Sequence, residues 1–559
     1  MNTKGAQIFI LFFLVLASLG LQAQSAHYGP FARATHYIQC LDVLDSTSVN
    51  VHTGIRNIYR KDVLQFLQGD LDDIRSTYLV QDNPLYVKES VLNQPTKGYL
   101  KSTIYKTPAS FFSINKNSFD LYVNPILNIS FGNEKQREGL RFNNLRGLEL
   151  YGLIDDKIYF YSSVLENQGN FHNYIERGIR KHKTLPGYSF FKPFNSTIID
   201  LNGHDYANAK AYLGVPISRH VNIEIGHGNH FIGHGYHSVL LEDYSNNYFY
   251  LKLNTRIWKF HYQNIFAELA PISTRAFGGD DLLPKKYMAT HYLSFKPHKN
   301  IEIGLFESII FSRVDNFEFQ YLNPVILYRT VEYYLNSPDN VMIGLNGKWN
   351  LFNRFSLYGQ FLVDDLKFDE LNNDLGWWGN KFAGQAGVFY PDAFGVKNLD
   401  LRAEVNAVKP FTYSHRDTLG TFDTYSVANY SNYNQPMAHP LGANFREALL
   451  LVRYQPIKSL ELSTMISYAQ QGRSGTIVNA GEDILFPNGT RSGDYGIGFL
   501  QGDLIDITSF KFRASYSFYH NYSLDFTFLK RSEQGNIPLD TDYWGFGIRA
   551  NFDGHRLDY

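Results

Sequence analysis

The chain has 559 residues, of which 44% are hydrophobic and 16% are aromatic, and its formal net charge is −1. This charge balance gives no bulk electrostatic reason to expect a nucleic-acid partner. A single Cys excludes a disulfide framework and any Cys-based zinc or iron–sulfur site. At this length the chain could form several globular domains or one large closed barrel.

The first 23 residues have the features of a secretory signal peptide. Lys4 precedes an apolar run from Ile8 to Leu21, and Ala23 follows as a small residue at the cleavage site. The apolar run is too short for a stable bilayer-spanning helix. We therefore predict export with removal of residues 1–23; an uncleaved N-terminal anchor is the alternative. No later segment is a candidate membrane helix, so the exported chain is either soluble or a membrane β-barrel.

Residues 24–118 do not show the alternation of the sequence that follows them. Within 51–67, the apolar residues Ile55, Ile58 and Val63 are spaced in a loosely helical way. We predict a partly helical N-terminal segment that lies in the periplasm or plugs the barrel.

From residue 119 onward, apolar and polar residues alternate with the period of two that β-strands require. In the run 510–518, the even-numbered positions are apolar or aromatic, whereas the odd-numbered positions are polar and include Lys511 and Arg513. Charges recur on the polar face of other runs, as at Arg402 and Glu404. We therefore predict a curved sheet with an apolar outer face and a wet, enclosed inner face.

The predicted strands number about 18. They cover 119–133, 141–154, 157–168, 206–217, 220–229, 247–256, 258–269, 287–296, 300–311, 340–350, 354–366, 380–390, 399–410, 445–455, 459–471, 504–519, 522–532 and 542–552.

The predicted connections alternate between short turns and mostly long loops. Asp155-Asp156 and His520-Asn521 are short turns, whereas 169–205 and 411–444 are long loops. This alternation is typical of bacterial outer-membrane barrels. We therefore predict an all-β fold, in which residues 119–559 form a single transmembrane antiparallel barrel with long extracellular loops. A soluble secreted all-β protein is the alternative.

Four histidines lie close together between Gly226 and Asn247: His227, His230, His234 and His237. Imidazole is a common zinc and copper ligand, yet this spacing matches no compact metal motif. The interspersed glycines indicate tight turns and close backbone approach, and Asp243 then lies among the polar residues of the loop. We interpret the stretch as a structural loop; contact with a ligand and a metal site are the alternatives.

A second stretch, 413–445, and the pair Trp377-Trp378 are chemically suited to sugars. Aromatic rings stack on the apolar faces of pyranoses, while planar polar groups bond their hydroxyls. The alternative is that these residues fold long loops over the barrel mouth. The candidate glycan or loop contacts here are Trp377, Trp378, Tyr413, His415, Arg416, Asp417, Tyr433, Asn434 and His439.

Catalysis is not supported by any motif. The adjacent carboxylates Asp364-Asp365 and Asp280-Asp281 point to opposite faces if they lie on strands, so neither forms a catalytic pair. Nucleophile-elbow, Walker and dinucleotide-binding patterns are missing. We predict no catalytic residue, no cofactor and no metal.

Several segments resemble one protein family. Residues 233–241 (GHGYHSVLL) followed by 248–258 (YFYLKLNTRIW) look like the glycine-rich loop and strand of the Bacteroidetes Wzi-like capsule-assembly proteins and the RemB-type gliding-motility proteins. Further similar segments are 320–345, 377–381 (WWGNK), 413–417 (YSHRD) and 433–445 (YNQPMAHPLGANF). The gliding-type resemblance is the closer one, because of the histidine-rich loop and the YSHRD segment.

The resemblance implies a large outer-membrane barrel. The enterobacterial Wzi member is a surface lectin that holds capsular polysaccharide, and RemB-type proteins assist surface gliding. No established binding residue of the family maps onto this sequence. Which of the two roles applies is therefore left open.

Three hypotheses for function follow. The first is a non-enzymatic outer-membrane barrel, surrounded by membrane lipid, whose external loops engage surface polysaccharide or the gliding or secretion machinery. The second is a porin or substrate channel, which charged inner-face residues such as Lys511 and Arg513 would permit. The third and remotest is a surface enzyme acting on glycans.

Overall fold

A computed structural model describes residues 25–45, 51–66, 73–85, 105, 107–196, 201–271, 285–313, 317–337, 339–372, 375–415, 427–475, 479–552 and 556–557. The predicted signal peptide, residues 1–23, lies outside the described residues. The candidate contacts Arg416 and Asp417 also lie outside them.

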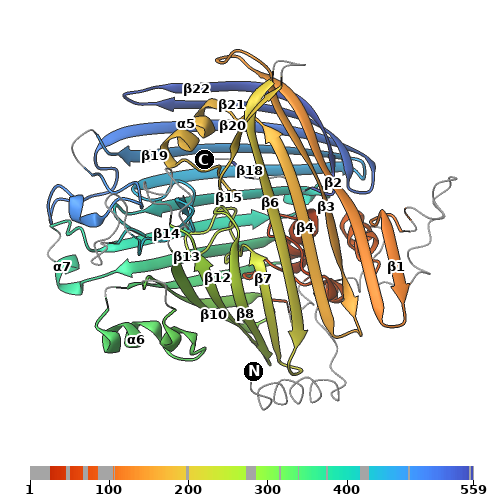
Figure 1. The fold of residues 1–559 in the computed structure, drawn as a ribbon, viewed down its shortest axis with the longest axis horizontal. Helices are drawn as coiled ribbons and strands as arrows, with labels where there is room; N and C mark the ends of the chain where they lie inside the picture. Colours follow the sequence, from red (N-terminus) through yellow and green to blue (C-terminus); the bar gives the residue numbers. More distant parts are fainter. Residues whose placement is uncertain are drawn as a thin grey trace, which may run out of the picture.

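The chain forms a closed antiparallel barrel (Figure 1). Of the 20 strands in the sheet, 18 form the wall, and the ring closes where the last strand, β22, pairs with β2. The wall strands are β2 (Phe119–Glu134), β3 (Arg141–Ile154), β4 (Ile158–Gly169), β6 (Leu201–Pro216), β7 (Val221–Gly228), β8 (Tyr248–Ile257), β9 (Phe260–Leu269), β10 (Lys286–His298), β11 (Ile301–Phe311), β12 (Asn340–Leu351), β13 (Phe355–Asp365), β14 (Lys381–Tyr390), β15 (Leu399–Val408), β18 (Phe445–Ile457), β19 (Leu460–Arg473), β20 (Asp503–Tyr519), β21 (Tyr522–Gln534) and β22 (Leu539–Ala550).

The prediction of a closed barrel of about 18 strands is confirmed. The predicted strands coincide with the wall strands, and their ends differ by a few residues. The largest difference is at β6, which begins at Leu201 because the short strand β5 (Lys192–Ser196) pairs with its first residues. A second short strand, β1 (Phe112–Lys116), pairs with the start of β2.

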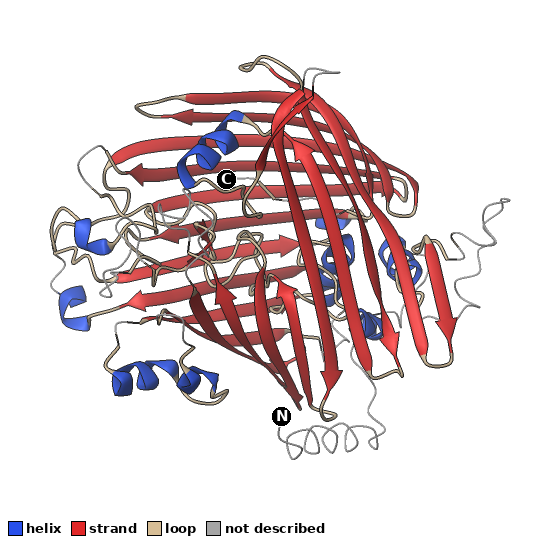
Figure 2. Ribbon diagram, in the orientation of Figure 1, coloured by secondary structure: helices blue, strands red, loops and turns tan. Residues whose placement is uncertain are grey.

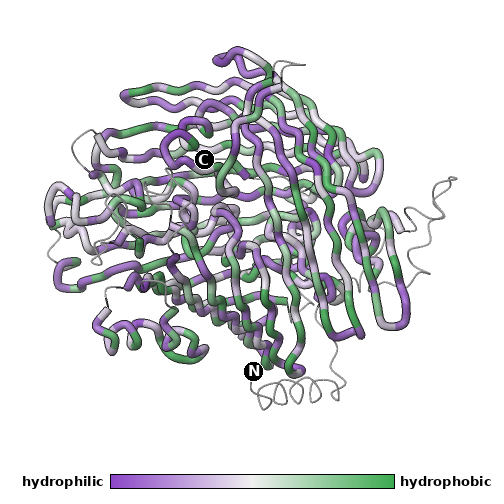
Figure 3. The backbone as a smooth tube through the Cα atoms, viewed as in Figure 1, coloured by the Kyte–Doolittle hydropathy of each residue, from purple (hydrophilic) through white to green (hydrophobic). Residues whose placement is uncertain are grey.

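The two faces of the wall differ as the alternation predicts, and Figure 3 shows apolar and polar residues alternating along the strands. On β20, Phe510 and Phe518 point outward and are 38% and 51% exposed. Arg513 points inward, where its guanidinium lies 3.8 Å from the carboxylate of Glu461. Large exposed apolar side chains recur around the outer face, including Val164, Leu213, Ile225, Phe249, Leu305, Leu345 and Val405.

Long connections gather at one end of the barrel, and short turns gather at the other. Most helices outside the N-terminal segment belong to the long loops: α5 (Asn173–His182), η4 (Phe319–Leu322), α6 (Tyr328–Leu335), α7 (Phe368–Asn372) and η6 (Asn488–Thr490), whereas η5 (Ala393–Gly395) lies in the turn after β14. The strands β16 (Ser431–Asn432) and β17 (Gln435–Pro436) form a small hairpin in the loop after β15. Among the described helices, none has both the length and the apolar character needed to cross a bilayer.

The N-terminal segment packs inside the barrel, and Figure 2 shows its helices within the outline of the sheet. It contains α2 (Arg33–Leu44), η1 (Arg60–Phe66) and α3 (Ile74–Gln81). Residues 51–59 are not helical, although their apolar spacing suggested a helix. The segment has a small apolar core of its own, formed by Tyr28, Ala32, Ala34, Tyr37, Ile38, Val51, Ile58, Val63 and Leu79.

Polar contacts hold this segment against the short-turn end of the wall. The Tyr78 hydroxyl donates to Asn521 in the β20–β21 turn. Arg75 on α3 forms ion pairs with Asp392 and Asp400, at 2.8 and 2.7 Å. Because these groups come from the turns and the inner face, the segment and the wall form one packed unit at this end.

Candidate functional site

The histidine-rich connection between β7 and β8, residues 229–247, folds into the barrel and is called the inner loop below. Gln360 on β13 accepts a hydrogen bond from the Val239 amide at 2.9 Å and donates one to the Ile232 carbonyl at 3.0 Å. Glu404 on β15 accepts hydrogen bonds from the amides of Tyr236 and His237. The inner-face polar residues of the wall therefore bind the backbone of this loop.

A glycine is required where the inner loop meets the wall. A Cβ added at Gly235 would lie 2.5 Å from a Glu404 carboxylate oxygen and 2.7 Å from the His237 carbonyl oxygen, which belongs to the backbone. Residues with side chains are too large for this approach. The close backbone approach expected from the glycines is thus present.

The inner loop meets the N-terminal segment in the middle of the lumen. The Gly233 amide donates to the Gly54 carbonyl at 2.8 Å, and Ile55 forms a β-bridge with Ile232. The guanidinium of Arg56 donates to three consecutive carbonyls of the loop, those of Gly233, His234 and Gly235. The two segments therefore fill the lumen from opposite ends and join there.

The described parts of the connection between β15 and β18, residues 409–415 and 427–444, cover the inner loop. The hydroxyls of Tyr413 and Tyr430 donate to the carbonyls of Val239 and Leu240, at 2.7 and 2.9 Å. Both rings are fully buried. These two tyrosines therefore hold the connection between β15 and β18 against the inner loop.

The two connections also share a buried cluster of histidines and carboxylates. His237 bonds Glu242 at 3.0 Å, and His439 bonds Glu447 on β18 at 2.9 Å. The His237 and His439 rings lie 4.2 Å apart between centroids. Burial alone would lower the pKa of His237, but the carboxylates of Glu242 and Glu447 raise it to about 9.

Most histidines chosen from the sequence are buried in this packing. His230, His234, His237 and His439 are at most 5% exposed. A surface glycan cannot reach such side chains without movement of the loops. The structure thus shows loop packing for these residues and for Tyr413.

Other chosen residues lie nearer the surface at the long-loop end. Trp377 and Trp378 are half-buried, and their rings are tilted at 54° to each other with centroids 5.9 Å apart. The Arg491 guanidinium lies 4.0 Å from the Trp378 ring centroid. His227 is exposed at the end of β7. Glycan contact stays a prediction for these residues and for the half-buried Asp243, His415 and Tyr433.

A cavity of about 430 Å³, called the mouth cavity below, opens among the long loops. It is formed by α5, by the loop after β15 and by the loop between β19 and β20. Of the candidate residues that the structure describes, Asn434 alone lines it. Its polar lining includes Arg177, Lys181, Arg473, Glu482, Asp483, Arg531, Glu533 and Asn536.

Several charged groups of the mouth cavity are paired with one another. Glu533 accepts hydrogen bonds from Arg177, Arg473 and Arg531. Lys181 binds Asp483 at 2.7 Å. Burial alone would lower the pKa of Lys181, but Asp483 raises it above its ordinary value. The wall of the cavity is therefore charged and held in place, with many donors and acceptors for hydroxyl-rich ligands.

The sequence analysis missed this cavity because α5 lies inside a stretch assigned as a loop, 169–205. The apolar residues Ile175 and Ile179 are four residues apart, and basic residues fill the last turn of the helix. That spacing is a helical signal. It could have identified α5 and its charged face.

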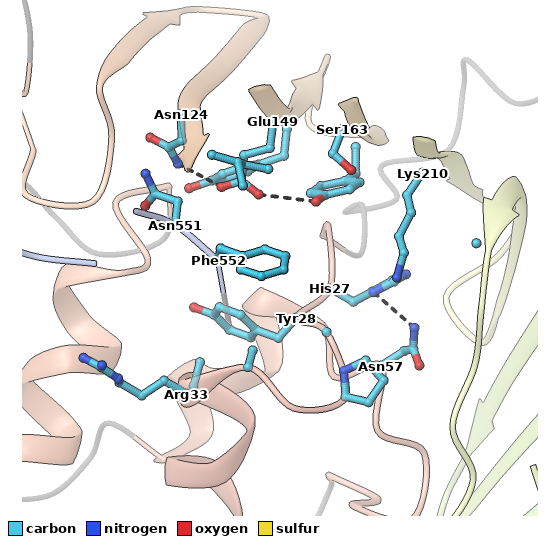
Figure 4. A pocket seen from close by; sticks show the side chains of 18 of the residues that line it. His27, Tyr28, Arg33, Asn57, Asn124, Glu149, Ser163, Lys210, Asn551 and Phe552 are labelled. Carbon is cyan, nitrogen blue, oxygen red and sulfur yellow. Dashed lines mark hydrogen bonds between the residues drawn. The ribbon is translucent and has the colours of Figure 1, made fainter. Parts of the chain in front are cut away.

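Another cavity, of about 260 Å³, lies deeper, between the N-terminal segment and β2 to β6 (Figure 4). Glu149 on β3 accepts a hydrogen bond from Asn124 at 3.1 Å, and Lys210 donates to Asn229 at 2.9 Å. Figure 4 shows His27 beside Asn57, with the Phe552 ring near the centre of the view. The lumen thus contains polar cavities between the wall and its filling.

Comparison with known proteins gives a family and a fold. The protein-family model described as Capsule assembly protein Wzi matches residues 163–528. A search of curated proteins gives no match. Among solved structures, the chain is similar to Wzi from Escherichia coli, described as an outer membrane protein involved in group 1 capsule assembly and a carbohydrate-binding β-barrel. That likeness has a TM-score of 0.56 at 10% identity and covers 95% of this chain and 99% of the other.

Two further solved structures give lower scores. OprD from Pseudomonas aeruginosa has a TM-score of 0.40 at 10% identity, covering 78% of this chain and 96% of the other. OccAB4 from Acinetobacter baumannii has a TM-score of 0.42 at 10% identity, covering 78% and 99%. The family match, by contrast, extends over more than half of the sequence, from β4 into β21. The chain therefore belongs to the Wzi capsule assembly family.

Proposed function

We propose that this protein is a non-enzymatic outer-membrane barrel that binds surface polysaccharide at its long-loop end and acts in attachment of a capsule or exopolysaccharide. The observation that carries the proposal is the mouth cavity on a barrel of the Wzi family. A carbohydrate-binding relative with the same fold supports the same class of ligand.

The outer surface supports a place in the outer membrane. Apolar side chains such as Leu305 and Val405 are about half exposed on the outer face, at 53% each. Exposed apolar residues around a closed antiparallel barrel favour contact with lipid. The long-loop end then faces outward, and the N-terminal segment faces the periplasm.

The charged groups of the mouth cavity favour binding over catalysis. Glu533 is held by three arginines, and Asp483 is held by Lys181. General acid–base chemistry on a glycan needs a carboxyl group that exchanges a proton with the substrate. Carboxylates fixed in ion pairs are suited to positioning a ligand and not to exchanging a proton with it. We therefore propose a non-enzymatic role.

The filled lumen argues against the channel hypothesis. Arg56 joins the N-terminal segment to the inner loop, and Tyr413 holds the next loop over that contact. A solute would have to displace these contacts to pass. We therefore expect the detergent-purified protein to show almost no conductance in planar bilayers.

Glycan arrays with the purified full chain test the ligand class. We expect the unaltered protein to bind the cell's own exopolysaccharide. We expect Lys181→Gln to weaken this binding at least about tenfold, which is the loss typical of a charge-assisted hydrogen bond. Lys299→Gln is the matched control, because Lys299 is exposed in the short turn before β11 at the opposite end. Equal affinities of the two variants would contradict a site in the mouth cavity.

A deletion strain tests the cellular role. For capsule attachment we expect exopolysaccharide to be released into the medium while colony spreading is unchanged. Lost spreading with normal retention would instead favour the gliding role implied by the RemB-type resemblance. Normal retention and normal spreading together would contradict both roles.

A further inference from the structure

A third cavity, of about 250 Å³, lies between the N-terminal segment and the inner face of β15, β18, β19 and β20, and is called the cationic cavity below. Among the residues that the structure describes, six cationic side chains and two carboxylates line it. The cations are Arg56, Arg402, Arg453, Lys511, Arg513 and Arg556, and the carboxylates are Asp400 and Glu461.

Both carboxylates are already engaged. Asp400 binds Arg75 at 2.7 Å and His36 at 2.8 Å, and Arg75 does not line the cavity. Glu461 forms an ion pair with Arg453, so this carboxylate neutralises one of the six cations in the lining. The charge of Arg556 is paired with two carboxylates that do not line the cavity, Glu242 and Asp243, at 2.8 and 2.7 Å.

Arg56 and Arg402 are bound by neutral acceptors in all the hydrogen bonds described for them. Arg402 donates to the His234 carbonyl and to the Gln39 side chain, and Arg56 donates to the same His234 carbonyl. Glu404, two residues along β15, accepts its hydrogen bonds from uncharged donors such as the Tyr358 hydroxyl. Two guanidinium groups therefore share one carbonyl oxygen without a carboxylate partner.

The electrostatics of Arg56 agree with this geometry. Burial, together with the charges of Arg402 and Arg556, lowers the pKa of Arg56 to about 9, although Tyr358 and Glu404 act in the opposite direction. Cations buried together are costly unless an opposite charge accompanies them.

Arg513 lies on the wall side of the same cavity. Its closest recorded carboxylate contact is Glu461, at 3.8 Å, and its Nε atom has no hydrogen-bond partner among the described residues. The side chain is 31% exposed, so water in the lumen reaches it. Arg513 therefore combines a partly exposed side chain with a buried Nε donor that has no described partner.

We propose that the cationic cavity binds a small anion that carries a phosphate or carboxylate group. Guanidinium groups bind these groups through paired, charge-assisted hydrogen bonds. The volume is near the lower end of the range for small-molecule sites, which suits inorganic phosphate or one acidic sugar unit. The site does not rest on the proposed function, because it lies between the N-terminal segment and the inner face and shares no lining residue with the mouth cavity.

Calorimetric titration of the detergent-purified full chain, in a low-salt buffer without phosphate, tests this site. We expect saturable binding of inorganic phosphate or of glucuronate, weakened by added chloride, and no binding of glucose. A comparison of the two anions shows whether the site prefers a free phosphate or the carboxylate of an acidic sugar. The absence of saturable binding by both anions, or equal binding by glucose, would overturn the proposal.

Variants locate the binding. Arg513→Gln is expected to weaken anion binding at least about tenfold, as for the loss of a charge-assisted hydrogen bond. Lys511→Gln is the second variant, for the case that Arg513→Gln lowers the yield of folded barrel. Arg329→Gln is the control, because Arg329 is 67% exposed in the loop between β11 and β12. Unchanged affinity in both cavity variants would overturn the proposal, whatever the glycan arrays show.

Discussion

At the scale of single residues, the polar side chains of the inner face determine how the lumen is filled. Gln360, Glu404 and Glu447 belong to the wall, and each binds a loop residue: Gln360 and Glu404 bind residues more than 100 positions away in sequence, and Glu447 binds His439, eight positions before it. Their polarity was predictable from the strand alternation, because they occupy inward-facing positions. Their partners were not, because His439 becomes a neighbour of His237 only after two loops have folded inward.

The raised pKa of His237 predicts a pH dependence of the inner loop. A group whose pKa is raised on folding from 6.5 to about 9 contributes stability in full below pH 6.5 and loses it as the pH rises through 9. Glu242 and Glu447 favour the charged ring, whereas Arg556 opposes it. We expect the loop to lose about 1–3 kcal/mol of local stability between pH 7 and pH 9.5.

Hydrogen exchange of the His237 and Ser238 amides, corrected for intrinsic rates, measures this loss. Both amides are bound to carboxylates of the site, those of Glu404 and Glu242. His237→Gln is the control, since Gln does not titrate in this range. A variant that shows the same change in protection with pH would refute the role of His237.

At the scale of elements, the strands were predictable and the folded loops were not. The run 510–518 reads as a strand because its two faces have different chemistry, and it lies within β20. The start of β6 was missed because its partner, β5, is short and lies in a predicted loop. The mouth cavity was missed for a related reason: α5 belongs to the same loop, and its side chains face groups more than 250 residues away, such as Glu533.

The inner loop is expected to keep the barrel closed to ions. Replacement of residues 230–244 by a short Gly-Ser linker removes the contacts to Gln360 and Arg56, so it should open a path through the lumen. We expect single-channel conductance in planar bilayers for this variant and almost none for the unaltered protein.

A control for this experiment is the same kind of replacement at residues 535–538, an exposed connection between β21 and β22. It leaves the inner loop intact and should stay silent. If the 230–244 variant is also silent while its circular dichroism shows a folded barrel, the inner loop is not the barrier.

At the scale of the whole molecule, the closed wall depends on the seam between β2 and β22. Gly132 and Gly545 lie opposite each other there. A Cβ at Gly132 would lie 2.3 Å from the Tyr543 ring and 2.4 Å from the Trp544 carbonyl oxygen. The backbone oxygen cannot move away without breaking the pairing of the two strands.

We therefore expect Gly132→Val to reduce the fraction of chains that form a closed barrel, at a cost of about 1–3 kcal/mol or more from overpacking. The shift of the folded band on unheated denaturing gels measures this fraction. Gly384→Val is the matched control, because a Cβ at Gly384 on β14 meets nothing within 4 Å. Comparable yields of folded barrel for the two variants would contradict the importance of the seam.

The position of Arg556 sets a limit on the order in which the barrel can assemble. This residue follows the last strand, yet it lies inside and binds Glu242 and Asp243 of the inner loop, which in turn is joined to Arg56. Contacts between the two ends of a long chain form late, because so much chain must first be brought together. The network that joins the inner loop to both Arg56 and Arg556 is therefore complete only after the residues beyond β22 have entered the lumen.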